Sequence, residues 1–316
     1  MKRVLILLLT LAMVFCLAAC GGSSVDWKKP AEVDSKNKIS TDNRADTPDE
    51  DVQTDEKTGP DNHVEVPKAA KAEIEEVVIF EEQGIKVTAK SLDPDALFGP
   101  ELKLLIENDS GKNLTFQCWD ASVNGYMVDT MMSVDVSNGK KANDELTFLS
   151  SDLELCGITE IADMEFSLHI FDAETWDSFI DSEMIQIKTS LADSYTYRFD
   201  DSGEVAYEGN GIKIVVKGLR EDGWLGPGIV VYIENDSGKN ITVQSRDESV
   251  NGFMVDAFFS SDIISGKRCI DTITFMDSDL EENEITAIEN VELSFYIYDQ
   301  DSWDTIVDTG VITIDF

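Results

Sequence analysis

An internal duplication constrains the fold of this chain more than any other feature. Residues 84–189 return as residues 211–316, and each counterpart lies 127 positions later without insertion or deletion. The run Glu107–Asn113 returns unchanged as Glu234–Asn240. A gapless copy of this length predicts two structurally equivalent domains, which we assign to residues 76–190 and 202–316.

Within each copy, apolar and polar residues alternate with period two, as expected for half-buried strands. Ile85, Val87 and Ala89 are typical of the pattern. The Asn124–Gly125 pair lies between two such runs and predicts a hairpin, because both residues tolerate the positive φ of a type I′ turn. The loop 109–112 predicts a second, longer hairpin. The segment 151–154 predicts a capped helical turn or a crossover between sheets.

These signals predict an all-β fold, with about seven or eight strands in each copy and turns at the spacing typical of immunoglobulin-like (Ig-like) domains. We therefore expect two tandem Ig-like antiparallel β-sandwich domains, after a signal peptide and a disordered linker. A partly open barrel is the alternative. Because the segment between the copies is short, we expect a fairly rigid junction.

The N-terminus has the pattern of an export signal. Lys2 and Arg3 precede the apolar run 4–15, which is too short for a relaxed membrane span and suits a signal peptide. The run ends in Leu-Ala-Ala-Cys at 17–20, which resembles the cleavage box of bacterial lipoproteins, whose cysteine becomes N-terminal and carries lipid. We predict a lipoprotein signal peptide over residues 1–19 and lipidation of Cys20. An ordinary signal peptide with a chance cysteine is the alternative.

Residues 20–75 are predicted to be a disordered acidic tether. The stretch is rich in Asp, Glu, Lys, Thr and Pro and has almost no large apolar residues, so folding would not offset the entropy lost on ordering. A flexible coil of this length spans roughly 40 Å. With two or more acyl chains on Cys20, such a tether would hold the folded part at the outer face of the cell membrane.

The charge balance excludes some partners. The formal net charge is −38, and the chain from Glu76 onward carries 49 acidic and 15 basic residues. Nucleic-acid binding needs a basic face, so we expect no nucleic-acid partner. Direct docking on anionic lipid is disfavoured for the same reason. Cation binding, a basic partner and plain solubility are left open.

The residue types that carry most enzymatic chemistry are scarce. The chain has two histidines, His63 in the predicted tether and His169 in a predicted strand. No nucleophile-elbow, phosphate-loop, dinucleotide-binding or zinc-protease motif occurs. Cys118, Cys156 and Cys269 lack metal-ligand spacing, and a bridge between the first two is left open. We expect a protein that is not an enzyme.

Carboxylates surround the tryptophan that the two copies share. Calcium binds six to eight oxygen ligands, so these carboxylates are candidate calcium ligands, although the loops lack EF-hand spacing: Asp172, Glu174, Asp177 and their counterparts Asp299, Asp301, Asp304. Solvated carboxylates that cap a helical turn are the alternative. Trp176 and Trp303 themselves are predicted to belong to the core.

The loops match between the copies better than the strands do, although loops ordinarily diverge faster. Turn geometry does not account for Lys112 and Asp129, or for their counterparts Lys239 and Asp256. One hypothesis is that both copies present the same contact surface through these residues and bind bivalently. A recent duplication is the alternative.

The lipoprotein box, the acidic linker and tandem all-β modules with the motifs I-E-N-D-S-G-K-N and V-N-G-[YF]-M-V-D together resemble surface lipoproteins of Gram-positive, clostridia-like bacteria. The modules of those lipoproteins are similar to the telokin-like Ig-fold group. The resemblance implies the fold and the location, and it brings no activity and no catalytic residues.

The sequence thus predicts a lipid-anchored, extracytoplasmic binding protein whose partner is a protein, a wall polymer or a glycan. A calcium-stabilised structural or adhesive surface module is one alternative. An accessory or inhibitory subunit of another exported protein, bound through an exposed strand edge, is the other. We expect no cofactor other than the candidate calcium.

Overall fold

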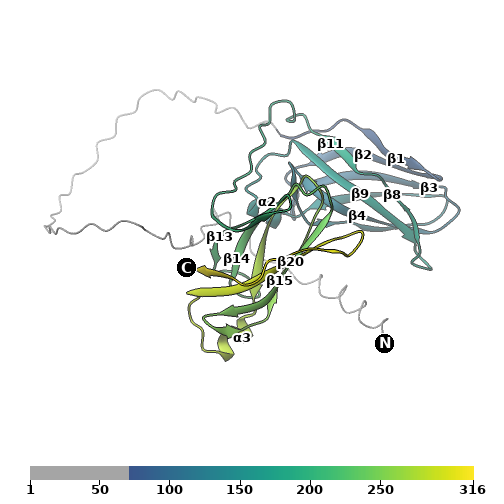
Figure 1. Ribbon diagram of the computed structural model, residues 1–316. Coiled ribbons are helices and arrows are strands. Elements are labelled where there is room, and N and C mark those ends of the chain that lie inside the picture. The colour runs from purple at the N-terminus through teal and green to yellow at the C-terminus, as the bar shows by residue number, and fades with distance from the viewer. Residues whose placement is uncertain (1–70) are drawn as a thin grey trace, which may run out of the picture.

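The computed structural model describes residues 71–316. The predicted signal peptide, Cys20 and the tether up to residue 70 lie outside the described residues. The regular structure of the described residues is β-strand apart from two short helices, which confirms the predicted all-β sandwich. Figure 1 shows two lobes, the first repeat in blue and teal and the second in green and yellow. Among residues 71–316 no helix is long and apolar enough to span a membrane.

The first repeat consists of two sheets. One sheet has the strand order β1 (Val77–Glu82), β2 (Ile85–Asp93), β3 (Glu101–Asn108), β8 (Lys140–Phe148) and β6 (Thr130–Met131). The other is built on the pair β4 (Leu114–Val123) and β9 (Asp163–Asp172), and four short strands extend it: β5 (Tyr126–Met127), β7 (Ser133–Val136), β10 (Ser178–Asp181) and β11 (Ile185–Lys188).

The second repeat has the same arrangement. Its first sheet contains β12 (Glu204–Gly209), β13 (Ile212–Arg220), β14 (Gly228–Asn235), β19 (Arg268–Phe275) and β17 (Ala257–Phe258). Its second sheet contains β15 (Ile241–Val250), β16 (Phe253–Met254), β18 (Ser260–Ile263), β20 (Asn290–Asp299), β21 (Thr305–Asp308) and β22 (Ile312–Asp315).

The alternating residues identified in the sequence form the cores. In β2 the side chains of Ile85, Val87 and Ala89 are at most 1% exposed, and they belong to one cluster with Phe166 and Leu168 of β9 in the opposite sheet. The second repeat has an equivalent cluster of its own. Each repeat therefore buries a separate core between two sheets.

Two turn predictions have opposite outcomes. Asn124 and Gly125 have φ values of 51° and 85° and join β4 to β5, which confirms the type I′ hairpin. The predicted hairpin at 109–112 is wrong, because β3 and β4 lie in different sheets. The side-chain amide of Asn108 explains the crossing, since it donates to the carbonyls of Lys112 (2.9 Å) and Val136 (2.6 Å) and so fixes the chain between the sheets.

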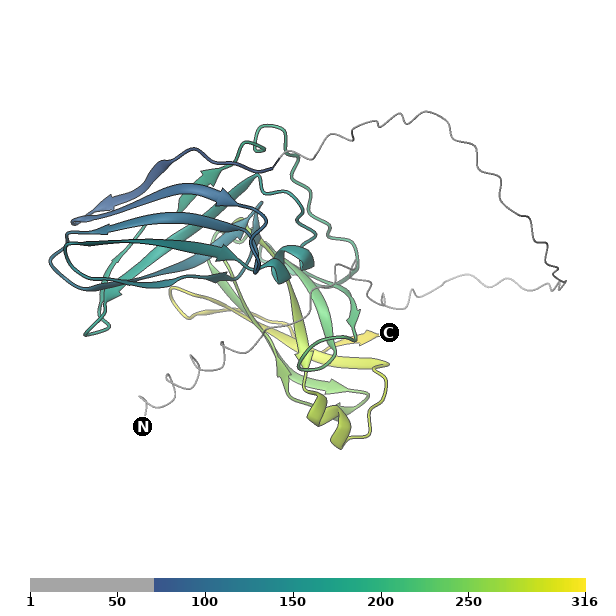
Figure 2. The same ribbon diagram turned by 180° about the vertical axis from the view of Figure 1, so that it is seen from behind.

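The helical turn predicted at 151–154 is α2 (Ser150–Leu155), and it connects β8 in one sheet to β9 in the other. Its counterpart is α3 (Asp277–Glu282). The N-cap residue is Leu149, without a side-chain capping bond, so the predicted capping of this turn is wrong. In Figures 1 and 2, α2 lies between the lobes and α3 lies at the far end of the second lobe.

The folded module includes residues before the predicted boundary at 76. Residues 71–76 form no helix or strand. Ala72 is nevertheless buried in the first core, and the Glu73 carbonyl accepts a hydrogen bond from the Ser190 N–H at 2.8 Å. The chain is thus attached to the first repeat from about this point.

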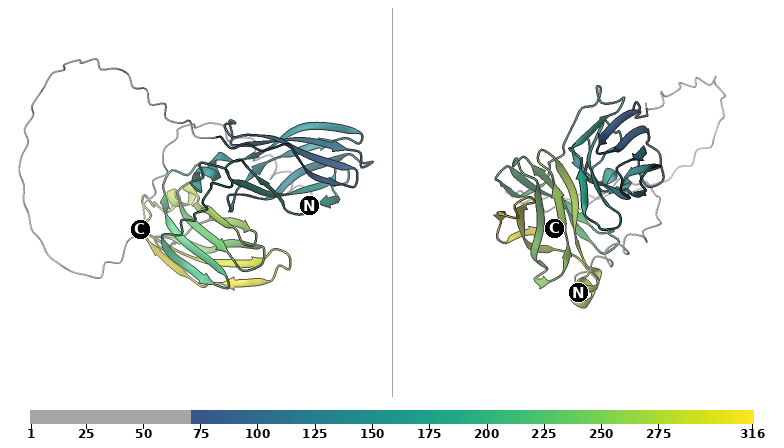
Figure 3. Two further views of the ribbon diagram at one scale, coloured as in Figure 1. Left: turned by 90° about the horizontal axis from the view of Figure 1, so that it is seen from above. Right: turned by 90° about the vertical axis from the view of Figure 1, so that its right-hand side faces the viewer.

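The two repeats pack directly against each other, and Figure 3 shows the lobes in contact from two further directions. Strand β5 of the first repeat pairs in parallel with β19 of the second, where the Arg268 N–H donates to the Gly125 carbonyl at 3.0 Å. Lys267 forms an ion pair of 2.7 Å with Glu165, and both side chains are less than 20% exposed. One sheet from each repeat thereby merges into an eleven-stranded sheet.

A small apolar cluster fills this junction. Tyr126 packs with residues of the second repeat's first sheet and with Phe199 of the connecting segment: Val215, Val230, Tyr232 and Ile270. Phe199 lies so close to Gly125 that a Cβ there would meet its ring at 3.1 Å, whereas the counterpart Gly252 has nothing within 4 Å. The first hairpin therefore has an added packing role that the second lacks. Cys118, Cys156 and Cys269 are all free thiols.

Candidate functional site: the two tryptophan turns

The two shared tryptophans are on the surface, which contradicts their predicted place in the core. Trp176 is 76% exposed and Trp303 is 73% exposed. Both have positive φ, 66° and 63°, a conformation that is unfavourable for a bulky residue and that Gly or Asn adopts more readily. The prediction is wrong because the chain turns here and enters β10 or β21. We call residues 172–177 and 299–304 the tryptophan turns.

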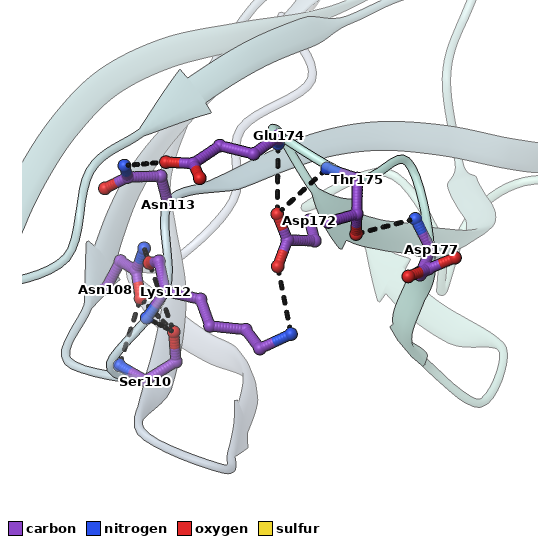
Figure 4. Close-up of polar contacts among 8 residues, drawn as sticks. All are labelled: Asn108, Ser110, Lys112, Asn113, Asp172, Glu174, Thr175 and Asp177. Carbon is purple, nitrogen blue, oxygen red and sulfur yellow. Dashed lines mark hydrogen bonds and ion pairs between the residues drawn. The ribbon is translucent and has the colours of Figure 1, made fainter.

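A carboxylate at the start organises the first turn, as Figure 4 shows. Asp172 Oδ1 accepts the backbone N–H groups of Glu174 (3.0 Å) and Thr175 (3.3 Å). The Trp176 N–H donates to the Asp172 carbonyl at 2.8 Å. The Thr175 hydroxyl accepts the Asp177 N–H at 3.4 Å. These bonds fix the backbone that carries the indole.

The second turn repeats this network. Asp299 Oδ1 accepts the N–H groups of Asp301 (2.9 Å) and Ser302 (3.3 Å), and the Trp303 N–H donates to the Asp299 carbonyl at 2.8 Å. Ser302 replaces Thr175 and accepts the Asp304 N–H at 3.3 Å. Both copies therefore hold their tryptophan by the same bonds.

A lysine from the crossing loop neutralises each organising carboxylate. Lys112 Nζ lies 2.9 Å from Asp172 Oδ2, and Lys239 Nζ lies 2.6 Å from Asp299 Oδ2. The hydrogen bond from Lys112, followed by that from the Glu174 N–H, lowers the pKa of Asp172. The equivalent bonds from Lys239 and the Ser302 N–H lower the pKa of Asp299 to about 2. Lys112 and Lys239, which are two of the predicted contact residues, thus lie beside the predicted calcium ligands Asp172 and Asp299.

The geometry favours turn capping for these carboxylates. Asp172 already holds a lysine and two amides, Glu174 accepts from Asn113 Nδ2 at 3.2 Å, and the Asp177 carboxylate points away from both in Figure 4. Within residues 71–316 no group of three or more His, Cys, Asp or Glu side chains converges in a way that would hold a metal ion. Calcium binding stays a prediction from sequence alone.

Each tryptophan ends a row of side chains in contact on the outer face of its sheet, which runs through Phe171 and His169 in the first repeat and through Tyr298 and Tyr296 in the second. Trp176 stacks on Phe171 (ring centroids 5.5 Å apart, interplanar angle 21°), and Trp303 stacks on Tyr298 (5.5 Å, 15°). Phe171 is only 6% exposed, because the indole covers it. Such contacts contribute about 0.5–1.5 kcal/mol beyond burial, and here they hold one face of each indole and leave the other open.

The far end of each row differs between the copies. In the first repeat Trp119 stacks on His169 at 3.8 Å. In the second repeat Arg246 occupies the place of Trp119, and its guanidinium lies 3.4 Å from the centre of the Tyr296 ring. His169 also bonds to Asp181, so the one histidine among the described residues is part of this packing.

The remaining predicted contact residues, Asp129 and Asp256, take no part in the hydrogen bonds of the tryptophan turns. Their N–H groups donate to Asp152 Oδ2 (2.6 Å) and Asp279 Oδ2 (2.7 Å) in the two short helices. This shared bond explains why both copies keep an aspartate at 152 and 279, whereas it uses only the backbone of Asp129 and Asp256. The four predicted contact residues therefore do not form a single surface.

Asp129 lines a cleft of about 730 Å³ between the repeats, with Asp120, Asp152, Asp262, Asp271 and Asp301 among the lining residues. Desolvation, followed by the charges of Asp152 and Asp271, raises the pKa of Asp129 to about 6. Desolvation and the charges of Asp262 and Asp301 across the junction raise the pKa of Asp120. The cleft thus brings carboxylates of both repeats together at the junction.

Comparisons with known proteins do not assign the chain to a family. No protein-family model matches it, and no curated protein does. Among solved structures, the crystal structure of the YadV chaperone is similar over 68% of this chain and 92% of its own, with 11% sequence identity and a TM-score of 0.22. A similarity this low supports no argument about fold or function.

Sequence reasoning missed the exposed indoles and the stacked rows. A signal for the rows was present: Trp119, His169 and Phe171 all fall on the polar phase of their strands, opposite the core residues. No comparable signal marks the positive φ of the tryptophans, because that depends on the network centred on Asp172 and Asp299.

Proposed function

We propose that this chain is an exported, lipid-anchored binding protein that contacts its partner through the two tryptophan turns. One observation carries the proposal: both repeats place an indole more than 70% exposed on a turn fixed by hydrogen bonds. Tryptophan is enriched among the residues that dominate binding energy at interfaces. An indole already fixed on an aromatic partner loses little conformational entropy when it is covered.

Duplication makes the proposed binding bivalent. Because the repeats pack against each other, the junction sets the separation of the two turns. A partner with repeated features would then bind the second turn with a high effective concentration. A wall polymer, a glycan and a protein with repeated segments all meet this requirement.

The test compares single and double substitutions in the full-length chain. Binding to isolated Gram-positive cell walls, and separately to proteins extracted from the cell surface, is measured by cosedimentation or by an immobilised-protein assay. We expect Trp176→Ala and Trp303→Ala each to weaken binding, and the double variant to lose more than a hundredfold as avidity disappears. Trp224→Ala is the matched control, because Trp224 is 81% exposed and lies outside the turns. Equal binding by the double variant and this control would exclude the turns as the contact.

The anchor is tested separately at Cys20. Two or more acyl chains hold a protein on a membrane stably. We expect the full-length chain expressed in a Gram-positive host to partition into the detergent phase and the Cys20→Ser variant to partition into the aqueous phase. A wild-type chain found in the aqueous phase would mean that Cys20 carries no stable lipid anchor.

A further inference from the structure

We infer that the open face of each indole in the tryptophan turns binds an arginine side chain, so that the partner is an arginine-rich polypeptide. The inference rests on the proposed function and names the chemistry of its partner. Three observations support it: the local charge, the geometry of the indole, and an arginine of this chain that lies on an aromatic ring at the other end of one row.

The charge around each indole favours a cation. The first turn has Asp172, Glu174 and Asp177 with Lys112 as the neighbouring cation, so its net charge is negative even after the Lys112 ion pair. The second turn has Asp299, Asp301 and Asp304 with Lys239. Among residues 71–316 no ion pair involves Glu174, Asp177, Asp301 or Asp304, so these four carboxylates are available to a cationic partner.

The indole supplies the second part of a cation site. Among aromatic rings, tryptophan attracts a cation above its face most strongly, and arginine is the commoner partner in proteins. Trp176 and Trp303 each use one face for stacking on Phe171 or Tyr298 and leave the other face open. Asp177 and Asp304 directly follow the indoles and supply carboxylates for the guanidinium N–H groups.

The protein itself shows this chemistry at the other end of one row. Arg246 lies flat enough on Tyr296 for its Cζ to be 3.4 Å from the ring centre, at the place where the first repeat has an indole on His169. The row thus accepts a guanidinium in place of an aromatic ring. A neutral sugar would also stack on an indole, but it would gain nothing from two turns that both keep excess negative charge.

The experiment measures binding of poly-arginine to the full-length chain by calorimetry at physiological salt, with poly-lysine of equal length for comparison. Cation–π contacts at exposed sites predict that each of Trp176→Ala and Trp303→Ala weakens poly-arginine binding about two- to fivefold. Neither variant changes the charge of the protein, so a loss of affinity cannot come from weaker long-range attraction. Trp224→Ala is the control and should bind as the wild type does.

Asp304→Asn provides a second variant, because the Asp304 side chain accepts no hydrogen bond within the described residues and its loss should leave the fold intact. We expect it to weaken poly-arginine binding more than Glu289→Gln, which removes one charge from elsewhere on the same repeat. Poly-arginine binding that is unchanged in the double tryptophan variant would overturn the inference. If that variant still loses cell-surface binding, the proposed function stands and only the arginine assignment fails. If neither measurement changes, both fail.

Discussion

At the scale of single residues, the same side chain has different surroundings in the two repeats. Asp129 and Asp256 are counterparts, and each donates its backbone N–H to an aspartate of a short helix. Asp129 in addition lies in the inter-repeat cleft, close to Asp152 and Asp271. Ionisation is therefore less favourable for Asp129 in the folded protein than in the unfolded chain.

This difference predicts a pH dependence. The pKa of Asp129 rises from 3.8 to about 6. Between about pH 4 and pH 6 the folded state therefore keeps a proton that the unfolded state has already released. Because the folded state binds more protons in this range, its stability falls as the pH rises. We expect the Asp129→Asn variant to melt at a higher temperature than the wild type at pH 7. We also expect it to lose less stability than the wild type between pH 4 and pH 6. Asp256→Asn is the matched control and should follow the wild-type profile. Parallel profiles for all three proteins would show that Asp129 ionises normally.

At the scale of elements, the sequence predicted what depends on local pattern. The strand alternation located β2 and β9, and the Asn124–Gly125 pair located a hairpin, because period and turn conformation are properties of neighbouring residues. The loop 109–112 has the same composition as a hairpin loop. Its crossing between sheets depends on Asn108 bonding to Val136, 28 residues away, and no local pattern reports that contact.

The sequence predicted where in the chain the candidate site lies, but it did not predict how the residues of the site contact one another. The sequence marked the carboxylates of residues 172–177 and Lys112, and the structure brings them together. It did not show that Lys112 bonds to Asp172, because these residues are 60 positions apart. The exposure of the Trp176 indole depends on that arrangement. Because the local sequence does not report it, Trp176 was predicted to lie in the core.

The turn as an element can be tested by removing its organising carboxylate. Asp172→Ala leaves two backbone N–H groups and Lys112 without their acceptor, so we expect a melting temperature lowered by a few degrees. Asp177→Ala should leave it unchanged, because no side-chain hydrogen bond or ion pair of Asp177 occurs in the described chain. Since the pKa values of Asp172 and Asp299 are lowered, their stabilisation is complete above about pH 4 and declines toward pH 2. Equal effects of the two substitutions would contradict the capping role.

At the scale of the whole molecule, the duplication is not symmetric, and one set of differences lies at the junction. The second repeat presents Val215, Val230, Tyr232 and Ile270 to the first. The counterparts in the first repeat are Thr88, Lys103, Leu105 and Asn143, so the same face there is more polar. Positions that are apolar in the second copy and polar in the first therefore mark the residues of the junction, and they can be found from the sequence alone. The same difference explains why the β4–β5 hairpin of the first repeat packs on the second repeat, and not the reverse.

The ion pair between Lys267 and Glu165 allows the coupling of the repeats to be measured. Removing one partner leaves the other charge largely buried, so we expect Lys267→Ala to lower the free energy of unfolding by about 1–3 kcal/mol. Lys140 is the counterpart of Lys267 in the first repeat and is exposed, so Lys140→Ala should change it by less than about 0.5 kcal/mol. Combining Lys267→Ala with Glu165→Gln completes a double-mutant cycle, since the second change removes the stranded charge. Because these residues belong to different repeats, a coupling energy between them can arise only if the repeats stay docked in solution. A cycle that closes with no coupling would mean that they separate, and the two tryptophan turns would then lack the fixed separation on which strong bivalent binding depends.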